Sequence, residues 1–476
     1  MDLSHFLFDR MQLEDIWKKL NCKEIILVMR ILHYFLGFPP YRTGGLTKFA
    51  FDLMKEQIND GNDVMALWPG EIKSYCANPQ IKQRKNIEKI KNYELINPLP
   101  VSLDEGIKEI TAFIKECDVG IYTEFLNNIG PNVIHIHTLM GLHKEFIEAA
   151  NQLGIRMVYT SHDYFGLCPK VTLYRDGKCC DDDHCCKNCI QCNLNGLSLK
   201  KIQIMQSPFY RWAKNTIFVK KLRERHRSVF FAEEKIPDMP DVDVDEFSES
   251  YRKLRNYYLW MYEHIDFIHF NSTVSESIFK RYIKPKRSGT ISITHKDIMD
   301  NIDNLHIKSE KVRFVYLAPT KPFKGFNLLR EALDDIWNLS SKNFELKVFS
   351  PVAEPSPYMR VKEEGFSHSE LGSIFSNADV LVAPSVWYET FGFTVIEALS
   401  YGVPVIVSDH VGAKDIIGEY GIVFESGKKE NLKDALSYIM KKTNMSKIIE
   451  KKKTITIKKW SDFTDEIMSI YEEIIR

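Results

Sequence analysis

The sequence predicts a helix in the second half of the chain that is associated with two glutamates. Glu389 lies just before its opening, and Glu397 lies on its body. An apolar strand precedes this helix, and Thr390 is a suitable N-cap for it. Three backbone amides at the opening then lack acceptors inside the helix: those of Phe391, Gly392 and Phe393. Free amides and the helix dipole together favour an anion such as a phosphate. The alternative is an ordinary crossover helix with two solvated glutamates.

A glycine turn follows the first expected strand. The residues from Ile25 to Leu67 predict a strand up to Leu32, a turn with Gly44 and Gly45, a helix and a second strand. The chain has neither a GxGxxG fingerprint here nor a Walker A sequence, so standard dinucleotide and P-loop sites are not indicated. On these residues alone, the glycine pair could be no more than a tight turn.

His162 is a candidate site residue because it follows the strand expected at Met157 to Thr160. Parallel sheets place ligands at the ends where their strands finish. Asp163 either orients the imidazole of His162 or caps the next segment. His135 and His137 alternate on an earlier strand, a pattern typical of histidines packed in a core.

The stretch from Pro384 to Gly412 contains PS, then E-x-FG, then EA-x-x-x-G-x-PV-x-x-S. It closely resembles the E-x7-E signature of retaining glycosyltransferases of the GT-B fold, in particular family 4, the glycosyl transferases group 1. The resemblance is tight over about residues 310–440 and loose over about residues 22–165. It implies that Glu389 contacts the sugar of a nucleotide-diphosphate sugar donor and that Glu397 contacts the ribose.

The same resemblance implies roles in the first half of the chain. His162 would lie near the reacting carbon and the acceptor, and the backbone of Gly44 and Gly45 would touch the diphosphate and sugar of the donor. Enzymes of family 4 retain the anomeric configuration and generally need no catalytic metal, so we expect no cofactor for catalysis.

Two lysines after the strand expected at Phe314 to Leu317 bear on the diphosphate. Family members usually carry Gly-Arg where this chain has Ala318 and Pro319. We expect Lys324 to neutralise the leaving diphosphate, whose charge grows as the glycosidic bond breaks, and Lys321 to substitute for the missing arginine. The alternative is that both are plain surface lysines.

The composition fits a globular protein of two or three domains. The chain has 476 residues, of which 44% are hydrophobic and 27% charged, and its 64 basic residues balance its 64 acidic ones. This balance argues against a nucleic-acid binder that acts through net charge. No apolar run is long enough for a transmembrane helix, and the acidic N-terminus is unlike a signal peptide, so we expect a cytoplasmic protein.

A group of cysteines between residues 168 and 192 has spacings typical of metal sites. Clustered thiols in a cytosolic chain indicate zinc more often than disulfides. We expect a structural zinc whose four ligands are Cys168, Cys179, Cys186 and Cys189. The alternative is a reduced loop without metal.

Residues 200–228 combine many lysines and arginines with interleaved aromatic and aliphatic side chains. Such a stretch can lie on an anionic membrane, here the inner face of the membrane, or bind a lipid-diphosphate acceptor. The alternative is a solvated helix face with its apolar side packed on the domain.

The predicted architecture is α/β, with two facing Rossmann-like doubly wound domains of the GT-B type. The expected parts are an acceptor domain at residues 21–284 with a cysteine-rich helical insert at 163–245, a polar linker at 284–309, a nucleotide-sugar domain at 310–455, and a closing helix at 456–476 that returns to the first domain. The predicted function is transfer of a sugar from a nucleotide-diphosphate sugar to a glycan or lipid-linked acceptor, in surface polysaccharide or glycoconjugate biosynthesis. The alternative is a catalytically inactive GT-B subunit that binds sugars or acts as a scaffold.

Overall fold

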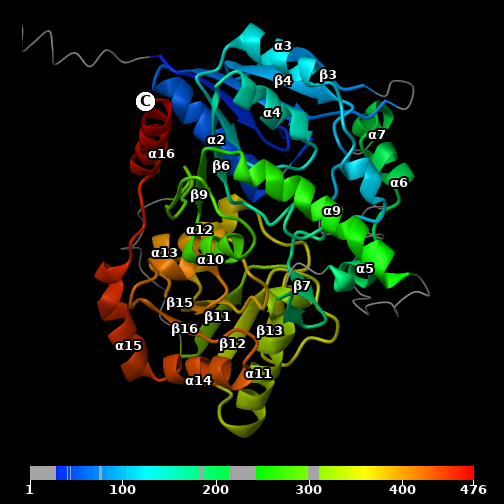
Figure 1. Ribbon diagram of the computed structural model, residues 1–476. Helices are drawn as coiled ribbons and strands as arrows, with labels where there is room; N and C mark the ends of the chain where they lie inside the picture. The colour runs from blue at the N-terminus through cyan, green and yellow to red at the C-terminus, as the bar shows by residue number, and fades with distance from the viewer. Residues whose placement is uncertain are drawn as a thin grey trace, which may run out of the picture.

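The structure is a computed structural model, which describes residues 28–39, 41–42, 44–73, 78–103, 105–181, 186–213, 216, 243–298 and 310–476. These residues form two lobes, each built around a β-sheet with helices on it, and Figure 1 shows one lobe above the other. Among the described residues, no helix is both long and apolar enough to cross a bilayer.

The sheet of the first lobe has eight strands in the order β10-β9-β6-β5-β1-β2-β4-β3. The strands are β1 (Arg30–Tyr34), β2 (Asp63–Pro69), β3 (Gln80–Ile87), β4 (Ile90–Ile96), β5 (Val133–Ile136), β6 (Arg156–Thr160), β9 (Phe267–Phe270) and β10 (Ser288–Thr290). All neighbours pair in parallel except β3, which is antiparallel to β4. The order β4-β2-β1-β5-β6-β9 is that of a Rossmann fold, in which the strand order reverses between β1 and β5.

The sheet of the second lobe has six parallel strands in the order β13-β12-β11-β14-β15-β16, again the Rossmann order. The strands are β11 (Val312–Tyr316), β12 (Phe344–Val348), β13 (Met359–Val361), β14 (Val380–Ala383), β15 (Val405–Ser408) and β16 (Gly421–Phe424). Successive side chains of β11 enter different apolar clusters: Phe314 and Tyr316 one of them, Val315 the other. Helices therefore cover both faces of this sheet.

The helices alternate with the strands in both lobes. Those of the first lobe are α2 (Gly45–Asn59), η1 (Ile110–Phe113), α3 (Val119–Ile129), α4 (Lys144–Gln152) and α10 (Thr273–Tyr282). Those of the second lobe are η2 (Pro322–Lys324), α11 (Phe326–Leu339), η3 (His368–Glu370), α12 (Leu371–Ser376), α13 (Phe393–Ser400), η4 (Gly412–Ile416), α14 (Lys429–Ile439), α15 (Lys442–Glu450) and η5 (Lys451–Thr454). Each lobe is thus doubly wound, as the sequence predicts.

The cysteine-rich insert of the first lobe folds into a small hairpin and short helices. Its elements are β7 (Tyr174–Arg175), β8 (Lys178–Cys179), α5 (Lys187–Asn193), α6 (Leu199–Met205), α7 (Pro208–Ala213) and the long helix α9 (Val244–Glu263). The buried face of α9 carries Tyr251, Leu254, Tyr258 and Tyr262 and packs against α5, α4 and η1. The insert therefore shares the core of the first lobe.

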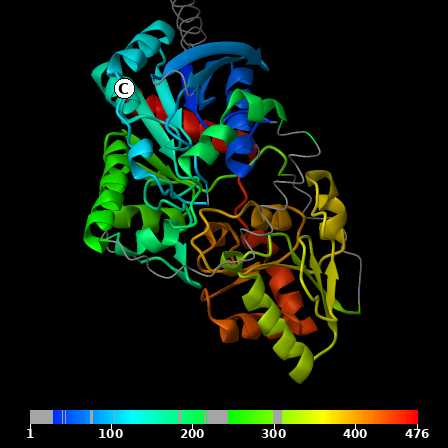
Figure 2. The same cartoon turned by 90° about the vertical axis from the view of Figure 1, so that its right-hand side faces the viewer.

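The last helix, α16 (Trp460–Ile475), leaves the second lobe and lies on the first. It contacts α2 and β6, and in Figure 2 the red helix lies among the blue N-terminal elements. Its apolar stripe, with Phe463, Ile467 and Tyr471 fully buried, belongs to an apolar cluster that also includes residues of both sheets. Burial of this stripe holds the two lobes together.

Three elements differ from the expectation. The first strand is β1, Arg30–Tyr34, rather than Ile25 to Leu32; residues 25–27 lie outside the described residues. The strand continues through His33 because this imidazole is fully buried and hydrogen-bonded. The edge strand β3 is mostly exposed and charged, so its sequence shows no apolar alternation. The strand β10 lies in the stretch expected to be a linker.

Candidate active site

Lys324 and Glu389 follow neighbouring parallel strands of the second sheet. Lys324 ends η2, which comes after β11, and Glu389 comes after β14. The strand order of this sheet reverses between β11 and β14. Open α/β sheets bind ligands at such a switch point, beyond the carboxyl ends of the strands.

The Nζ atom of Lys324 lies 2.7 Å from Oε1 of Glu389, although 65 residues separate the two in sequence. The hydroxyl of Ser385 donates to the other carboxylate oxygen at 2.5 Å, and Lys324 also lies over the ring of Trp387, 4.8 Å from its centroid. Burial acts to raise the pKa of Glu389, but the ion pair with Lys324 and the hydrogen bond from Ser385 outweigh it, so this pKa is lowered. The glutamate is therefore held ionised beside a cation.

Gly325 lets the lysine loop reach the glutamate loop. Its φ is 75°, in the left-handed region, and a Cβ added there would lie 1.8 Å from the carbonyl oxygen of Pro384. Only a residue without a side chain permits this approach. Gly325 therefore allows Lys324 to reach Glu389.

The opening of α13 has the expected free amides, but a different cap. The N-cap is Gly392 with φ 101°, without a side-chain cap, whereas the hydroxyl of Thr390 donates to the carbonyl oxygen of His162 at 3.1 Å. Thr390 as the N-cap is therefore wrong, because its hydroxyl joins the two lobes instead. Within the described chain, the amides of Phe391, Gly392 and Phe393 have no protein acceptor.

Gly44 and Gly45 lie opposite the same helix. Gly44 has φ 126°, and the space beside its Cα is open. A Cβ on Gly45 would lie 3.2 Å from the ring of Phe393. The structure thus brings the glycine turn of the first lobe and the amide-rich opening of α13 to one place.

Glu397 is buried between two imidazoles that sequence reasoning missed. Its Oε1 atom lies 3.4 Å from Nε2 of His295 and 3.3 Å from Nε2 of His368. Both ring nitrogens of the buried His295 lack a hydrogen-bond partner within the described residues. The three groups could hold a cation or contact the polar groups of a ligand. No sequence signal indicates His295, because it lies in the stretch expected to be a linker.

His162 lies at the contact between the lobes, where Thr390 binds its carbonyl oxygen. Its Nε2 atom lies 3.3 Å from Nδ1 of His137. The carboxylate of Asp163 instead accepts hydrogen bonds from the amide of Phe165 and the hydroxyl of Thr138. Asp163 therefore caps the next segment, and a histidine holds the imidazole of His162.

Lys321 takes a different position from Lys324. Its Nζ atom lies over the ring of Phe323, 5.3 Å from the centroid, at the start of η2. The loop that carries both lysines is thus fixed by aromatic contacts.

The cysteines do not assemble as the four expected ligands. The thiol of Cys179 donates to the carbonyl oxygen of Val386 at 3.2 Å and lies 3.5 Å from Nδ1 of His410, so it faces the second lobe. Cys186 and Cys189 are buried together, and a hydrogen bond between them and burial raise the pKa of Cys189, with a smaller contribution from Cys168. In the described part of the chain, no three of these thiols come within 4.8 Å of one another.

The sequence of the second lobe matches a known family. Residues 361–455, which include Glu389 and Glu397, match the family model described as "Glycosyl transferases group 1". The phosphatidyl-myo-inositol mannosyltransferase of Mycobacterium leprae (strain TN) is 28% identical over 102 residues, which are 21% of this chain and 27% of that relative. The match thus spans about a quarter of the length of this relative.

Solved structures resemble the whole chain at low sequence identity. Sucrose-phosphate synthase from Thermosynechococcus elongatus is 15% identical, with a TM-score of 0.53 over 94% of this chain and 99% of the other. A structure described as trehalose-6-phosphate from E. coli bound with UDP-2-fluoro glucose is 11% identical, with a TM-score of 0.51 over 93% and 98%. These similarities show a GT-B fold, and the family match over residues 361–455 supports a glycosyltransferase.

The ion pair predicts a dependence of stability on pH. Because the pKa of Glu389 is lowered in the folded state, its contribution to the free energy of unfolding is present above the ordinary glutamate pKa and is lost as the pH falls through the lowered value. Glu389→Gln lacks this contribution. The difference in unfolding free energy between wild type and variant should therefore shrink on acidification, as denaturant titrations at neutral and acidic pH will show. A difference that stays constant contradicts this assignment.

Proposed function

We propose that the protein is a retaining glycosyltransferase of family 4 that moves a sugar from a nucleotide-diphosphate sugar to a glycan or lipid-linked acceptor. The observation that carries this proposal is the pair of Lys324 and Glu389, 2.7 Å apart at the switch point and beside the amides at the opening of α13. A cation and free amides can hold the diphosphate, and a carboxylate can accept hydrogen bonds from sugar hydroxyls.

The proposed roles follow the chemistry of each group. Lys324, Lys321 and the amides of α13 hold the diphosphate, Glu389 orients the sugar, and Glu397 contacts the ribose. The bond from the anomeric carbon to the diphosphate breaks, a bond from that carbon to the acceptor oxygen forms, and the acceptor proton passes to the leaving diphosphate. This route needs no metal, so turnover should persist with a chelator present.

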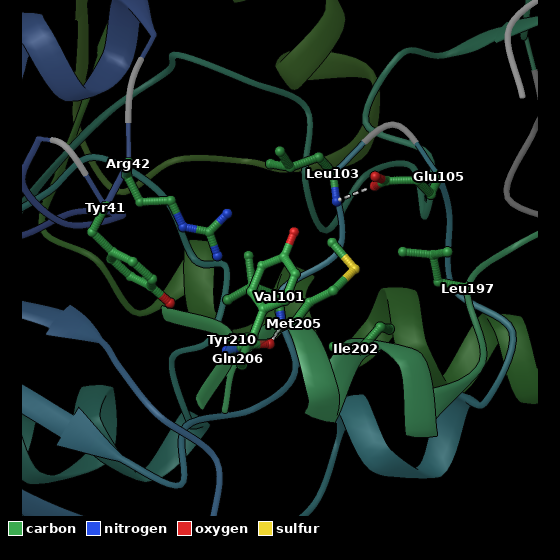
Figure 3. Close-up of a pocket in the computed structure, with 10 residues that line it drawn as sticks. All are labelled: Tyr41, Arg42, Val101, Leu103, Glu105, Leu197, Ile202, Met205, Gln206 and Tyr210. Atoms are coloured by element: carbon green, nitrogen blue, oxygen red, sulfur yellow. Dashed lines mark hydrogen bonds between the residues drawn. The ribbon is translucent and has the colours of Figure 1, made fainter. Parts of the chain in front are cut away.

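A pocket of about 120 Å³ in the first lobe is the proposed acceptor site. It lies between the loop before Gly44 and the helix α6, and Figure 3 shows the side chains of Arg42 and Tyr210 extending into the space between them. The Nε atom of Arg42 is buried without a hydrogen-bond partner in the described residues. A guanidinium whose buried Nε has no partner among the described residues, beside apolar side chains such as Ile202, suits an acceptor with an anionic and an apolar part.

A contact with the membrane would bring a lipid-linked acceptor to this pocket. The helix α7, next to the pocket, exposes Phe209 and Trp212, which are 72% and 75% accessible, and α6 exposes Ile204. A guanidinium nitrogen of Arg211 lies 2.7 Å from a carboxylate oxygen of Glu94, so this arginine forms an ion pair within the first lobe. Residues 214–215 and 217–228 of the predicted membrane stretch lie outside the described residues.

Replacing both exposed aromatics is expected to weaken binding to anionic liposomes. Phe209→Ser with Trp212→Ser removes the apolar groups that would enter the interface, so the bound fraction at low salt should fall. Leu339→Ser, which replaces an exposed apolar residue of the second lobe, is the matched control and should leave binding unchanged. If the wild type does not bind anionic liposomes at low salt, the proposed membrane contact is contradicted.

A structural zinc in the cysteine-rich insert is a further part of the proposal. It is supported by the burial of Cys186 beside Cys189 and by the electrostatic interaction of Cys189 with Cys168. Measurement of zinc in the purified protein tests it, and Cys186→Ser with Cys189→Ser should lower the zinc content. Protein that holds no zinc when purified without chelators would contradict it.

The test of the function is a heat-shift screen with nucleotide sugars followed by transfer assays. Stabilisation by a nucleoside diphosphate, with slow hydrolysis of one donor sugar, is the expected result. Binding without turnover on any acceptor would instead support the inactive scaffold. The anomeric configuration of the product, read by NMR, distinguishes retention from inversion.

A further inference from the structure

Histidines gather at the ends of four neighbouring strands in the first lobe. His33 lies on β1, His135 on β5 with His137 just beyond it, and His269 on β9, and all four are fully buried. His162 follows β6. Three further buried groups complete the set: Gln57 of α2, Thr160 of β6 and Tyr471 of α16. These side chains form one continuous line of hydrogen bonds.

One part of the line runs from Ile291, just after β10, to the closing helix. His269 Nε2 lies 2.8 Å from the carbonyl oxygen of Ile291, and His269 Nδ1 lies 2.9 Å from the hydroxyl of Thr160. The same hydroxyl lies 2.7 Å from Nε2 of His135, whose Nδ1 lies 2.6 Å from the hydroxyl of Tyr471.

The other part runs from the closing helix to His162 at the contact between the lobes. The hydroxyl of Tyr471 lies 3.3 Å from the amide nitrogen of Gln57, whose oxygen lies 2.7 Å from Nε2 of His33. His33 Nδ1 lies 3.0 Å from Nε2 of His137, and His137 Nδ1 lies 3.3 Å from Nε2 of His162. Every ring nitrogen of His33, His135 and His137 therefore has a hydrogen-bond partner, so this cluster does not offer lone pairs to a metal.

The carbonyl oxygen of Ile291 fixes the direction of the first part. It can only accept, so His269 carries its proton on Nε2 and accepts at Nδ1 from the hydroxyl of Thr160. That hydroxyl has one proton, so it accepts from Nε2 of His135. His135 then accepts at Nδ1 from the hydroxyl of Tyr471.

The same direction continues to His162. The hydroxyl of Tyr471 donates its one proton in the hydrogen bond to His135, so it accepts from the amide NH₂ of Gln57. The oxygen of Gln57 then accepts from Nε2 of His33. His137 donates from Nε2 to His33, and His162 donates from Nε2 to His137. A flipped Gln57 would demand the opposite direction, and Thr160 would then have no proton to donate to His269.

The imidazoles are neutral, as this count of one proton each requires. Burial lowers the pKa of His33 and of His269 to about 4, and that of His162 to about 3. Burial also lowers the pKa values of His135 and His137 well below the ordinary histidine value. At neutral pH each ring therefore holds a single proton.

We propose that Tyr471 of the closing helix is a positioning residue, which through this line of hydrogen bonds fixes His162 in the tautomer with its proton on Nε2 and a lone pair on Nδ1. In the described part of the chain, Nδ1 of His162 has no hydrogen-bond partner. His162 thus offers a permanent acceptor at the contact between the lobes. Under the proposed function, on which this last step rests, it accepts a hydrogen bond from a hydroxyl of the acceptor or donor sugar.

The test is the protonation state of His162 in protein with ¹⁵N-labelled histidine side chains. An NMR spectrum that correlates ring nitrogens with ring protons shows which nitrogen of each imidazole is protonated. The signals that disappear in His162→Ala are those of His162, which identifies it among the 14 histidines. The wild type should show Nε2 protonated and Nδ1 unprotonated. Tyr471→Phe and Thr160→Val, which each interrupt the line, should show both tautomers, whereas Thr160→Ser keeps the hydroxyl and should match the wild type.

Tyr358→Phe is the matched control, because it removes a buried tyrosine hydroxyl that bonds Asp334 in the second lobe, away from the line. It should leave the tautomer of His162 unchanged. A proton on Nδ1 in the wild type would overturn the proposal, and so would a single unchanged tautomer of His162 in either Tyr471→Phe or Thr160→Val.

Turnover gives a second readout. With both tautomers populated, Tyr471→Phe should lower kcat about twofold or more, with the KM for the donor unchanged, because a fraction of the molecules holds the wrong tautomer. Thr160→Ser should restore what Thr160→Val loses. The tautomer measurement needs no substrate, so it can hold when no sugar transfer is found and can fail when transfer is confirmed.

Discussion

Lys324→Ala is expected to lower turnover at least about tenfold, which corresponds to about 1.4 kcal/mol of barrier height. Lys324 is the cation that lies 2.7 Å from Glu389, and under the proposed function it faces the diphosphate on which negative charge grows. Its loss also leaves the buried carboxylate of Glu389 without its ion-pair partner, so the pKa of Glu389 should rise. Both effects act on the step in which the bond to the leaving diphosphate breaks.

Initial-rate kinetics with a donor sugar found by heat-shift measure this effect. Lys429→Ala is the matched control, because Lys429 pairs with Asp335 on the outside of the second lobe and should leave turnover unchanged. Glu389→Ala should cost a similar factor, and the double variant should lose less than the two single effects combined, since the residues are in contact. If Lys324→Ala turns over as fast as the wild type, Lys324 is not part of the active site.

Gly325→Ala is expected to lower the free energy of unfolding by about 1–3 kcal/mol and to abolish most turnover. The added Cβ would lie 1.8 Å from the carbonyl oxygen of Pro384, and backbone atoms cannot move aside as a flexible side chain can. The loop after β11 must then separate from the loop after β14. Lys324 would leave Glu389, so stability and turnover should fall together.

The control for Gly325→Ala isolates the steric effect from the backbone strain. Gly427 has φ 73°, close to the 75° of Gly325, but no atom lies within 4 Å of a Cβ built there. Gly427→Ala therefore carries the same left-handed strain without the collision, and it should lose only a small part of the stability and no turnover. Equal losses in both variants, by denaturant titration, would show that the contact with Pro384 is not the cause.

The sequence by itself determined the features that depend on local chemistry. The apolar runs that become β14 and β15, the helix between them and the glycines at the turns are read from residues that are neighbours along the chain. Glu389, Gly44, Gly45 and Lys324 could be singled out because each stands near a strand end or a helix opening, where α/β folds expose polar groups. Glu397 lies on the body of its helix and was singled out by the motif resemblance. A resemblance in ordered motif positions then gave their expected roles.

Only the tertiary structure decided how distant side chains meet. Ser385 and Lys324 both bind the carboxylate of Glu389, and the two imidazoles beside Glu397 come from other segments, one of them expected to be a linker. Cys179 was expected with the other thiols, yet the hairpin that carries it packs on the second lobe. His135 was expected to be a packed core histidine, which its burial confirms, but its bond to Tyr471 joins residues 336 positions apart. Contacts of this kind leave no periodic pattern in the chain, because they depend on the packing of whole elements rather than on the spacing of residues within one.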